Sequence, residues 1–301
     1  MFQKLFENRK GLSMDRLRRF VEVVDLGGVT RAANNDPSLQ SQISRQVKEL
    51  EEFFGMDLFN REGRRMVLNS AGERLATIIR QNLHDLEAFK LEAVGGLRKY
   101  TLGAGDALLH WVLSPRLPGI IKRNMSLEIS SHPTQEIVRK VQNGGLDFGL
   151  VNTREVAKDF KHKKMGRMTY SLFIPRKLIP KKTGAGWKQL FASVPLAMFE
   201  SGGQFTSSLQ QAMNRTGIAP EIILRCKSFP QAAAAMRREA CGAILPDIAR
   251  EDLPEKTFKA IEIPFLKEIS RDISLVWNKR LEEVRDGSGH FAMQLTDLLK
   301  L

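Results

Sequence analysis

The sequence predicts an α/β chain in which a small helical unit with one hairpin precedes two lobes of alternating strands and helices. Three observations support this prediction. Apolar residues recur at helical spacing between residues 14 and 54. Gly95-Gly96 marks a hinge. After that hinge, short strand patterns alternate with helix patterns, a rhythm typical of a mostly parallel sheet. The length of 301 residues fits two or three domains.

The N-terminal helices are separated by turn signals. Residues 14–26 have the apolar spacing of a helix that ends at Gly27-Gly28. A short helix is expected at residues 30–34. A longer helix is expected over residues 38–54, where Gly55 stops it.

The longer helix has one apolar stripe and one polar face. Its apolar residues, Ile43, Val47, Leu50 and Phe54, are spaced four, three and four apart. The polar side chains are Gln40, Ser41, Gln42, Ser44, Arg45 and Lys48. A helix, a tight turn and a second helix with a polar N-terminal half form the helix-turn-helix layout. Because Gln and Arg side chains pair with base edges in the major groove, the polar face predicts DNA binding.

A hairpin with arginines follows this helix pair. Short strand patterns at residues 58–59 and 66–68 flank Arg61, Arg64 and Arg65. We interpret the hairpin as a wing whose arginines reach the DNA backbone or the minor groove.

A long helix is expected next. Ser70-Ala71-Gly72-Glu73 has the pattern of a capping box with Ser70 as N-cap. The helix continues to about residue 94 with apolar residues at three-to-four spacing. That stripe is longer than one small domain covers, so it packs either inside the chain or against a second chain.

Two α/β lobes follow, and a groove between such lobes is a natural small-ligand site at the carboxyl ends of the strands.

The net charge of +13 favours a polyanionic partner. Residues 1–100 hold 17 Lys/Arg and 14 Asp/Glu, so only +3 of that charge lies there. Much of the excess falls in residues 158–188, which is either solvated surface or a basic rim for an anion or for DNA.

Signatures of other function classes are missing from the sequence. It contains no complete GxGxxG, no P-loop, no GxSxG and no HExxH. The five histidines lack metal-ligand spacing, and two cysteines exclude a disulfide framework. We therefore expect no catalytic residues, no metal and no cofactor. No apolar run reaches about 18 residues, which predicts no membrane partner. The start, MFQKLFENRK, lacks signal-peptide features, and this favours the cytoplasm.

The chain resembles the LysR-type transcriptional regulators from Met14 onward. The resemblance is carried by Thr30-Arg31-Ala32-Ala33, by residues 40–47, by Gly55 with Leu58-Phe59 and Arg61, and by residues 68–73. Two later segments also match, residues 144–150 (GGLDFGL) and 240–246 (ACGAILP).

The resemblance implies four parts. They are an N-terminal extension at 1–13 (unless Met14 is the start), a winged helix-turn-helix DNA-binding domain at 14–72, a linker dimerisation helix at 73–96, and a two-lobed, periplasmic-binding-protein-like effector domain at 97–301. Lobe I would cover about 97–160 and 268–301, and lobe II about 161–267. A homodimer through the linker helix, a homotetramer and contact with RNA polymerase are implied as well.

The expected DNA-binding residues are Thr30, Arg31, Gln40, Ser41, Gln42, Ser44, Arg45, Lys48, Arg61, Arg64 and Arg65. By family position, the expected effector-binding residues are Asp106, Thr134, Asn152, Ser201 and Phe229, where free backbone N–H groups suit an anionic small molecule. Two alternatives stay open: a DNA-binding regulator whose effector domain no longer senses a ligand, and an α/β enzyme fused to a DNA-binding head.

The chain departs from the family pattern near the turn. Gly28 stands where the family has Ser as a helix cap, Asp36 replaces an apolar residue, and Leu39 replaces a Ser. We expect Ser38 to cap the longer helix instead.

Overall fold

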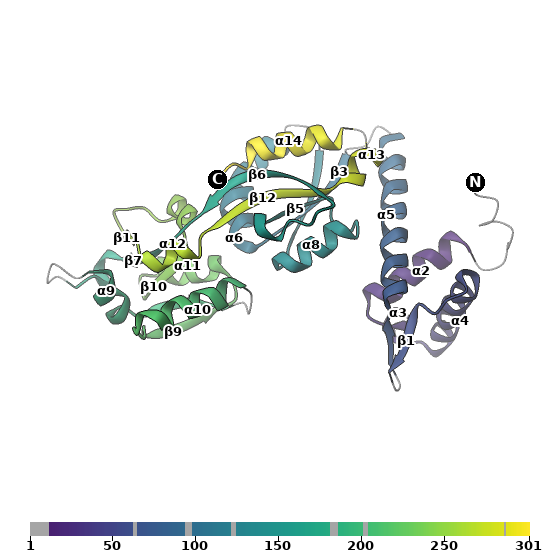
Figure 1. Cartoon of the computed structure of the whole chain (residues 1–301), viewed down its shortest axis with the longest axis horizontal. Helices are drawn as coiled ribbons and strands as arrows, with labels where there is room; N and C mark the ends of the chain where they lie inside the picture. Colours follow the sequence, from purple (N-terminus) through teal and green to yellow (C-terminus); the bar gives the residue numbers. More distant parts are fainter. Residues whose placement is uncertain are drawn as a thin grey trace. The chain divides into compact units, whose positions relative to one another are not determined.

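The computed structural model describes residues 12–62, 65–93, 98–121, 125–180, 186–200, 204–285 and 287–301 (Figure 1). Contacts divide the chain into an N-terminal unit, residues up to 96, and a C-terminal unit that begins at residue 97. Within the described ranges, no helix combines the length and the apolar character that crossing a membrane requires. Gly95-Gly96, Arg64, Ser201 and residues 1–11 of the expected extension lie outside these ranges.

The N-terminal unit contains the expected helices and hairpin. The helices are α2 (Met14–Asp25), α3 (Val29–Ala32), α4 (Pro37–Phe54) and α5 (Ser70–Ala93), and the hairpin pairs β1 (Phe59–Glu62) with β2 (Arg65–Leu68). Ile43, Val47 and Leu50 of α4 are buried, which confirms the apolar stripe. They pack with α2 residues such as Phe20 and Val23.

The turn between α3 and α4 is built from left-handed residues. Asn34 and Asn35 have φ of +49° and +64°, and asparagine tolerates this conformation better than most side chains do. Gly55 ends α4 at φ +64°. The turn therefore follows from the local sequence.

Two predicted helix caps are wrong. Asp36, not Ser38, caps α4, because its carboxylate accepts hydrogen bonds from the N–H groups of Ser38 and Leu39 and Pro37 occupies the first turn. Asn69, not Ser70, caps α5, since its Oδ1 accepts a hydrogen bond of 2.9 Å from the Gly72 N–H. The true cap lies two residues before Ser38 in α4 and one residue before Ser70 in α5.

The C-terminal unit has two five-stranded mixed sheets, which confirms the α/β fold class. The first has the order β4 (Met125–Ser131), β3 (Arg98–Ala104), β5 (Phe148–Asn152), β12 (Arg271–Asn278) and β6 (Phe160–Met168). The second has the order β11 (Phe258–Ile261), β7 (Tyr170–Pro175), β10 (Gly242–Pro246), β8 (Leu196–Phe199) and β9 (Ile222–Cys226).

The strands of the expected βαβαβ run, β3, β4 and β5, do pair in parallel, but neither complete sheet is mostly parallel. β12 runs antiparallel to β5 and β6, and β7 runs antiparallel to β10 and β11. The chain enters the second sheet near Thr169 and returns to the first sheet at Arg271. The strands next to these two crossings, β7 and β12, are the antiparallel ones. β6 forms the edge of the first sheet, although we expected residues 161–168 in the second lobe.

Helices cover both faces of the first sheet (Figure 1). Ile137 of α8 (Thr134–Gln142) packs with Val276 on one face, and Phe291 of α14 (Ser288–Leu298) stacks 4.5 Å from the Tyr100 ring on the other. Between β3 and β4 run α6 (Asp106–Leu108), a π-turn, a 3-10 turn and α7 (Leu117–Ile121). The remaining helices are α9 (Trp187–Ser193), α10 (Gln204–Thr216), α11 (Phe229–Arg237), α12 (Pro264–Glu268) and α13 (Lys279–Val284).

Candidate functional sites

The exposed face of α4 has the polar character that the sequence predicts. Ser41, Gln42, Ser44, Arg45 and Lys48 are exposed, whereas the apolar stripe of the same helix is buried. The side chains of Arg45 and Lys48 are 74% and 75% exposed, so both charges point to solvent. The face can therefore offer amide, hydroxyl and cationic groups to a partner.

Intramolecular contacts hold this face only loosely. Arg45 Nε lies 3.8 Å from Glu49 Oε1, and Lys48 Nζ lies 3.7 Å from Glu52 Oε1. Exposed pairs of this kind contribute about 0–1 kcal/mol, so a phosphate or a base can displace them. Glu49 also pairs at 2.6 Å with Arg16.

Gln40 and Ser41 have local roles in addition. Gln40 Nε2 donates to Thr30 Oγ1 at 3.3 Å and links α4 to α3, and Ser41 Oγ donates to the Pro37 carbonyl at 3.0 Å. The Arg31 guanidinium donates to the Leu26 carbonyl at 3.4 Å. Thr30 and Arg31 remain exposed on α3.

The hairpin is tied to α4 by a residue that the sequence reading did not select. Glu51 Oε1 accepts hydrogen bonds from the N–H groups of Leu58, at 2.8 Å, and Phe59, at 3.3 Å. Arg61 pairs with Met66 in the hairpin ladder, and Arg65 pairs with Glu62. The side chains of Arg61 and Arg65, and all of Arg64, lie outside the described part of the structure.

A cavity of about 620 Å³ lies in the C-terminal unit. Its wall is formed by the start of α6, the segment between β4 and α8, the end of β5, the start of β7, the end of β8, and residues of α10, α11 and β12. Volumes of about 300–1,000 Å³ are typical of small-ligand sites.

Four of the five expected effector residues lie on the cavity wall: Asp106, Thr134, Asn152 and Phe229. The fifth, Ser201, lies outside the described ranges. Asp106 accepts a hydrogen bond from the Ser131 hydroxyl, and Asn152 caps the following 3-10 turn through the Arg154 N–H. Two of the four therefore also have a structural role.

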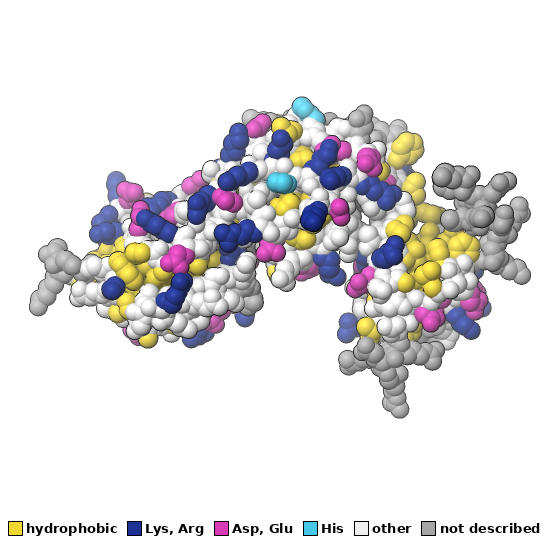
Figure 2. All heavy atoms as spheres, in the orientation of Figure 1, with side chains coloured by type: hydrophobic (Ala, Val, Ile, Leu, Met, Phe, Trp, Pro, Cys, Tyr) yellow, Lys and Arg dark blue, Asp and Glu magenta, His cyan; other side chains and the backbone are white. Residues whose placement is uncertain are grey.

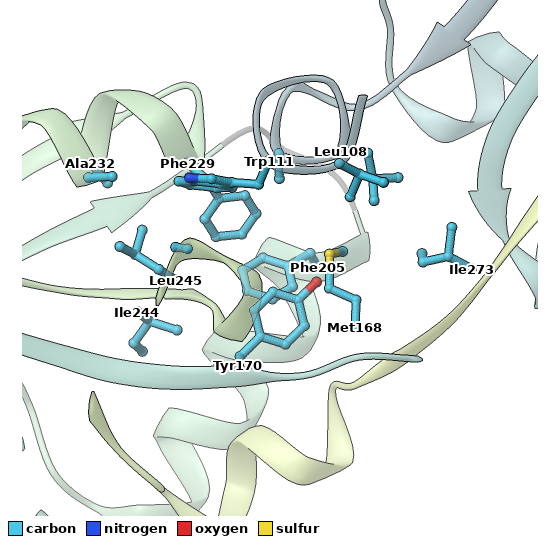
Figure 3. Packing of buried hydrophobic residues seen from close by; sticks show 14 of the residues in the cluster. Leu108, Trp111, Met168, Tyr170, Phe205, Phe229, Ala232, Ile244, Leu245 and Ile273 are labelled. Carbon is cyan, nitrogen blue, oxygen red and sulfur yellow. The ribbon is translucent and has the colours of Figure 1, made fainter. Parts of the chain in front are cut away.

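Apart from Phe229, the aromatic part of the wall was missed from sequence. Tyr170, Phe199, Phe205 and Phe229 form a connected cluster, in which the Phe199 and Phe229 rings stack at 4.2 Å and the Tyr170 and Phe205 rings lie 4.7 Å apart. Figure 3 shows Tyr170, Phe205 and Phe229 gathered beside Met168. Because these residues come from four separate segments, no local pattern links them.

Polar atoms in the cavity wall lack hydrogen-bond partners within the described structure. These atoms are Tyr170 Oη and His132 Nε2, both buried. Burial raises the pKa of Tyr170 to about 12, and the nearby Arg271 opposes this in part. His132 Nδ1 lies 3.2 Å from Glu136 Oε1. Tyr170 is therefore a protonated donor at neutral pH.

The basic stretch at residues 158–188 falls largely on β6 and the segments around it. Lys161 pairs with Glu282, and Lys164 pairs with Asp272 at 3.3 Å. Figure 2 shows blue and magenta side chains interspersed on the visible face of this unit. Lysines on an edge strand discourage pairing with another sheet, which is a structural role. Lys181 and Lys182 lie outside the described residues.

The described ranges offer neither clustered metal ligands nor an exposed thiol. They contain no group of three or more His, Cys, Asp or Glu side chains that could hold a metal ion. Cys226 and Cys241 are free and buried, and burial raises the pKa of both thiols.

The long helix α5 exposes large apolar side chains. Ile78, Leu86 and Phe89 are 48%, 54% and 71% exposed. These residues are spaced eight and three apart, which places them on one side of a helix. Such a stripe needs a partner surface to be buried.

Comparisons with known proteins agree with this architecture. Residues 14–73 match the family model described as "Bacterial regulatory helix-turn-helix protein, lysR family", and residues 95–285 match "LysR substrate binding domain". The HTH-type transcriptional regulator cbl of Klebsiella aerogenes is 28% identical over 209 residues, which cover 65% of this chain and 65% of that relative.

Solved structures share the fold. The crystal structure of CbnR, a LysR family transcriptional regulator, has a TM-score of 0.63 at 18% identity and covers 96% of this chain and 100% of that one. The structure of full-length CbnR with its target DNA has a TM-score of 0.61 at 17% identity, over 95% and 99% of the two chains.

Proposed function

This chain belongs to the LysR family of transcriptional regulators, and from that premise we propose which of its residues bind DNA and which bind the effector. A member of this family is a DNA-binding transcriptional regulator with an effector-binding domain, not an enzyme. The observation that carries the residue assignment is the exposed polar face of α4, opposite the buried residues Ile43, Val47 and Leu50.

We assign base reading to the N-terminal half of α4. Gln42 can pair with adenine N6/N7, Arg45 can pair with guanine O6/N7, and Ser44 is short enough to let the helix approach the bases closely. The complete proposed surface is Thr30, Arg31, Gln40, Ser41, Gln42, Ser44, Arg45 and Lys48, with Arg61, Arg64 and Arg65 of the wing. Thr30 and Gln40 also hold α3 and α4 together through their hydrogen bond.

The cavity of the C-terminal unit is the proposed effector site. Asp106, Thr134, Asn152 and Phe229 lie on its wall, and Ser201 is assigned to it by sequence position alone. Its volume suits a small molecule, and buried polar atoms in its wall lack partners in the described structure. Burying these groups without partners costs folding free energy. A domain that no longer bound a ligand would have no compensation for that cost.

The remaining assignments follow from family membership and from α5. We propose domains at 14–72, 73–96 and 97–301, a homodimer through the exposed stripe of α5, a homotetramer of two such dimers, contact with RNA polymerase, and action in the cytoplasm. The stripe supports the dimer because large exposed apolar side chains on one helix side favour helix pairing.

Footprinting tests the proposal after genome-wide mapping has identified the bound sites. We expect the full-length chain to protect a discrete site and to change its protection when a small molecule occupies the cavity. Protection that does not change with any cavity ligand would indicate a ligand-independent regulator. Absence of any protected site would overturn the DNA assignment.

A further inference from the structure

We propose that the cavity binds an aromatic monocarboxylate, with its ring against the phenylalanine cluster and its carboxylate on Arg271. This inference rests on the proposed effector role of the cavity and names the chemical class of the effector.

The phenylalanine cluster, which consists of Phe199, Phe205 and Phe229, provides an apolar aromatic surface. The rings of Phe199 and Phe229 are stacked, with 17° between their planes, and Phe205 meets Phe229 edge-on at 5.1 Å. All three residues line the cavity. Aromatic rings favour offset-stacked or edge-to-face contact with a further ring, so a planar aromatic body gains more here than an aliphatic one does.

Arg271 provides the charge. Its guanidinium carbon lies 5.0 Å from the Phe205 ring centroid, and Arg271 lines the cavity. The described residues supply no ion-pair partner to Arg271, although they pair with many other arginines, Arg250 and Arg237 among them. A guanidinium has five N–H donors in a planar fork that fits a carboxylate through two parallel hydrogen bonds.

Tyr170 provides a second donor near the first. Its hydroxyl is buried without a described partner, and Arg271 is close enough to act on its pKa. Because that pKa is raised to about 12, the hydroxyl is protonated and can donate to a ligand oxygen. The flexible Met168 side chain lies beside the hydroxyl in Figure 3 and can move to let a ligand reach it.

Other charges in the wall restrict the ligand further. Asp106 and Glu155 also line the cavity, so a second carboxylate on the ligand would meet negative charge. Beside the Phe205 ring a cationic group is disfavoured, because it would meet the positive charge of Arg271. One carboxylate on one aromatic body satisfies both conditions.

Ligand-observed NMR and calorimetry on the full-length chain test this with four probes: benzoate, benzamide, cyclohexanecarboxylate and phthalate. We expect benzoate to bind, benzamide to bind at least about tenfold more weakly because it cannot form the charged pair, and the other two to bind more weakly than benzoate. We expect Arg271→Gln to weaken benzoate binding by about tenfold or more, and Tyr170→Phe by a smaller factor.

Arg250→Gln is the matched control. Arg250 also lies over a phenylalanine, with its guanidinium carbon 5.6 Å from the Phe173 ring, but it does not line the cavity. We expect this variant to bind benzoate as the unmodified chain does. Equal benzoate affinities for Arg271→Gln and Arg250→Gln would overturn the assignment, as would equal affinities for benzoate and benzamide.

The variant Thr134→Trp, which fills the cavity from α8, separates this inference from the effector role itself. If an uncharged or aliphatic molecule binds the unmodified chain but not Thr134→Trp, the cavity is an effector site and the aromatic monocarboxylate is wrong. If benzoate binds equally to Thr134→Trp, benzoate lies outside the cavity and the aromatic monocarboxylate is wrong.

Discussion

The carboxylate of Glu51, on α4, accepts a hydrogen bond of 2.8 Å from the backbone N–H of Leu58, at the start of the hairpin segment. The same oxygen accepts a second bond from Phe59. One side chain of α4 therefore holds the start of the hairpin segment. This contact links the two parts of the proposed DNA-binding surface.

We expect Glu51→Ala to destabilise the N-terminal unit by about 1–3 kcal/mol, because two backbone N–H groups lose their partner. Thermal unfolding and operator affinity measure the effect, and affinity should fall along with stability. Glu52→Ala is the control, since Glu52 is 66% exposed and its pair with Lys48 is long. Similar behaviour of the two variants would show that Glu51 does not hold the wing.

Asp36→Ala should weaken α4 by about 0.5–2 kcal/mol, because it removes the side chain that accepts from two first-turn N–H groups. Ser38→Ala should have little effect, since Ser38 contributes its backbone N–H rather than its hydroxyl to the cap. Hydrogen exchange of the first-turn amides of α4 distinguishes the two. Faster exchange in Ser38→Ala alone would mean that the serine is the cap.

The raised pKa of Tyr170 predicts that the folded chain loses stability at high pH. Its pKa is about 12 in the folded chain and 10.0 as the reference, so the unfolded state loses its proton first as pH rises. The stabilisation is complete below pH 10, falls between pH 10 and 12, and amounts to about 2–3 kcal/mol. The unfolding free energy of the unmodified chain should therefore fall relative to that of Tyr170→Phe in this window. A pH-independent difference between them would contradict the raised pKa.

Phe89→Glu should weaken self-association, because it puts a charge on the most exposed apolar residue of the α5 stripe. Light scattering measures the mass in solution, with Met293→Glu on α14 as a control at another exposed apolar position. If Phe89→Glu has the same mass in solution as the unmodified chain, the stripe of α5 does not form the proposed dimer interface.

Local patterns predicted most of the elements but not the contacts between distant segments. The spacing of Ile43, Val47 and Leu50 is a property of one helix, so the stripe was predicted and is confirmed. β6 was missed because its edge position puts consecutive lysines, such as Lys163 and Lys164, in solvent and removes the alternation of a strand.

The cavity residues also divide into those predictable from local sequence and those that depend on distant contacts. Asp106 and Thr134 begin the helices that follow β3 and β4, and Asn152 is the last residue of β5; such strand ends are recognisable in the sequence. Phe205 and Arg271 meet only after the chain has crossed between the sheets, and 66 positions of sequence separate them. A lone arginine before a strand carries no sign of such a contact.

The affinity of Arg45→Ala for an operator identified by genome-wide mapping decides whether the exposed face of α4 reads DNA. The variant should lose about 1–3 kcal/mol of binding free energy to that site, or about 5- to 150-fold in Kd, and should discriminate less against a scrambled duplex. Lys259→Ala, which removes one exposed positive charge from β11 in the C-terminal unit, is the control and should retain the original affinity. If Arg45→Ala binds both duplexes as Lys259→Ala does, the exposed face of α4 does not read DNA.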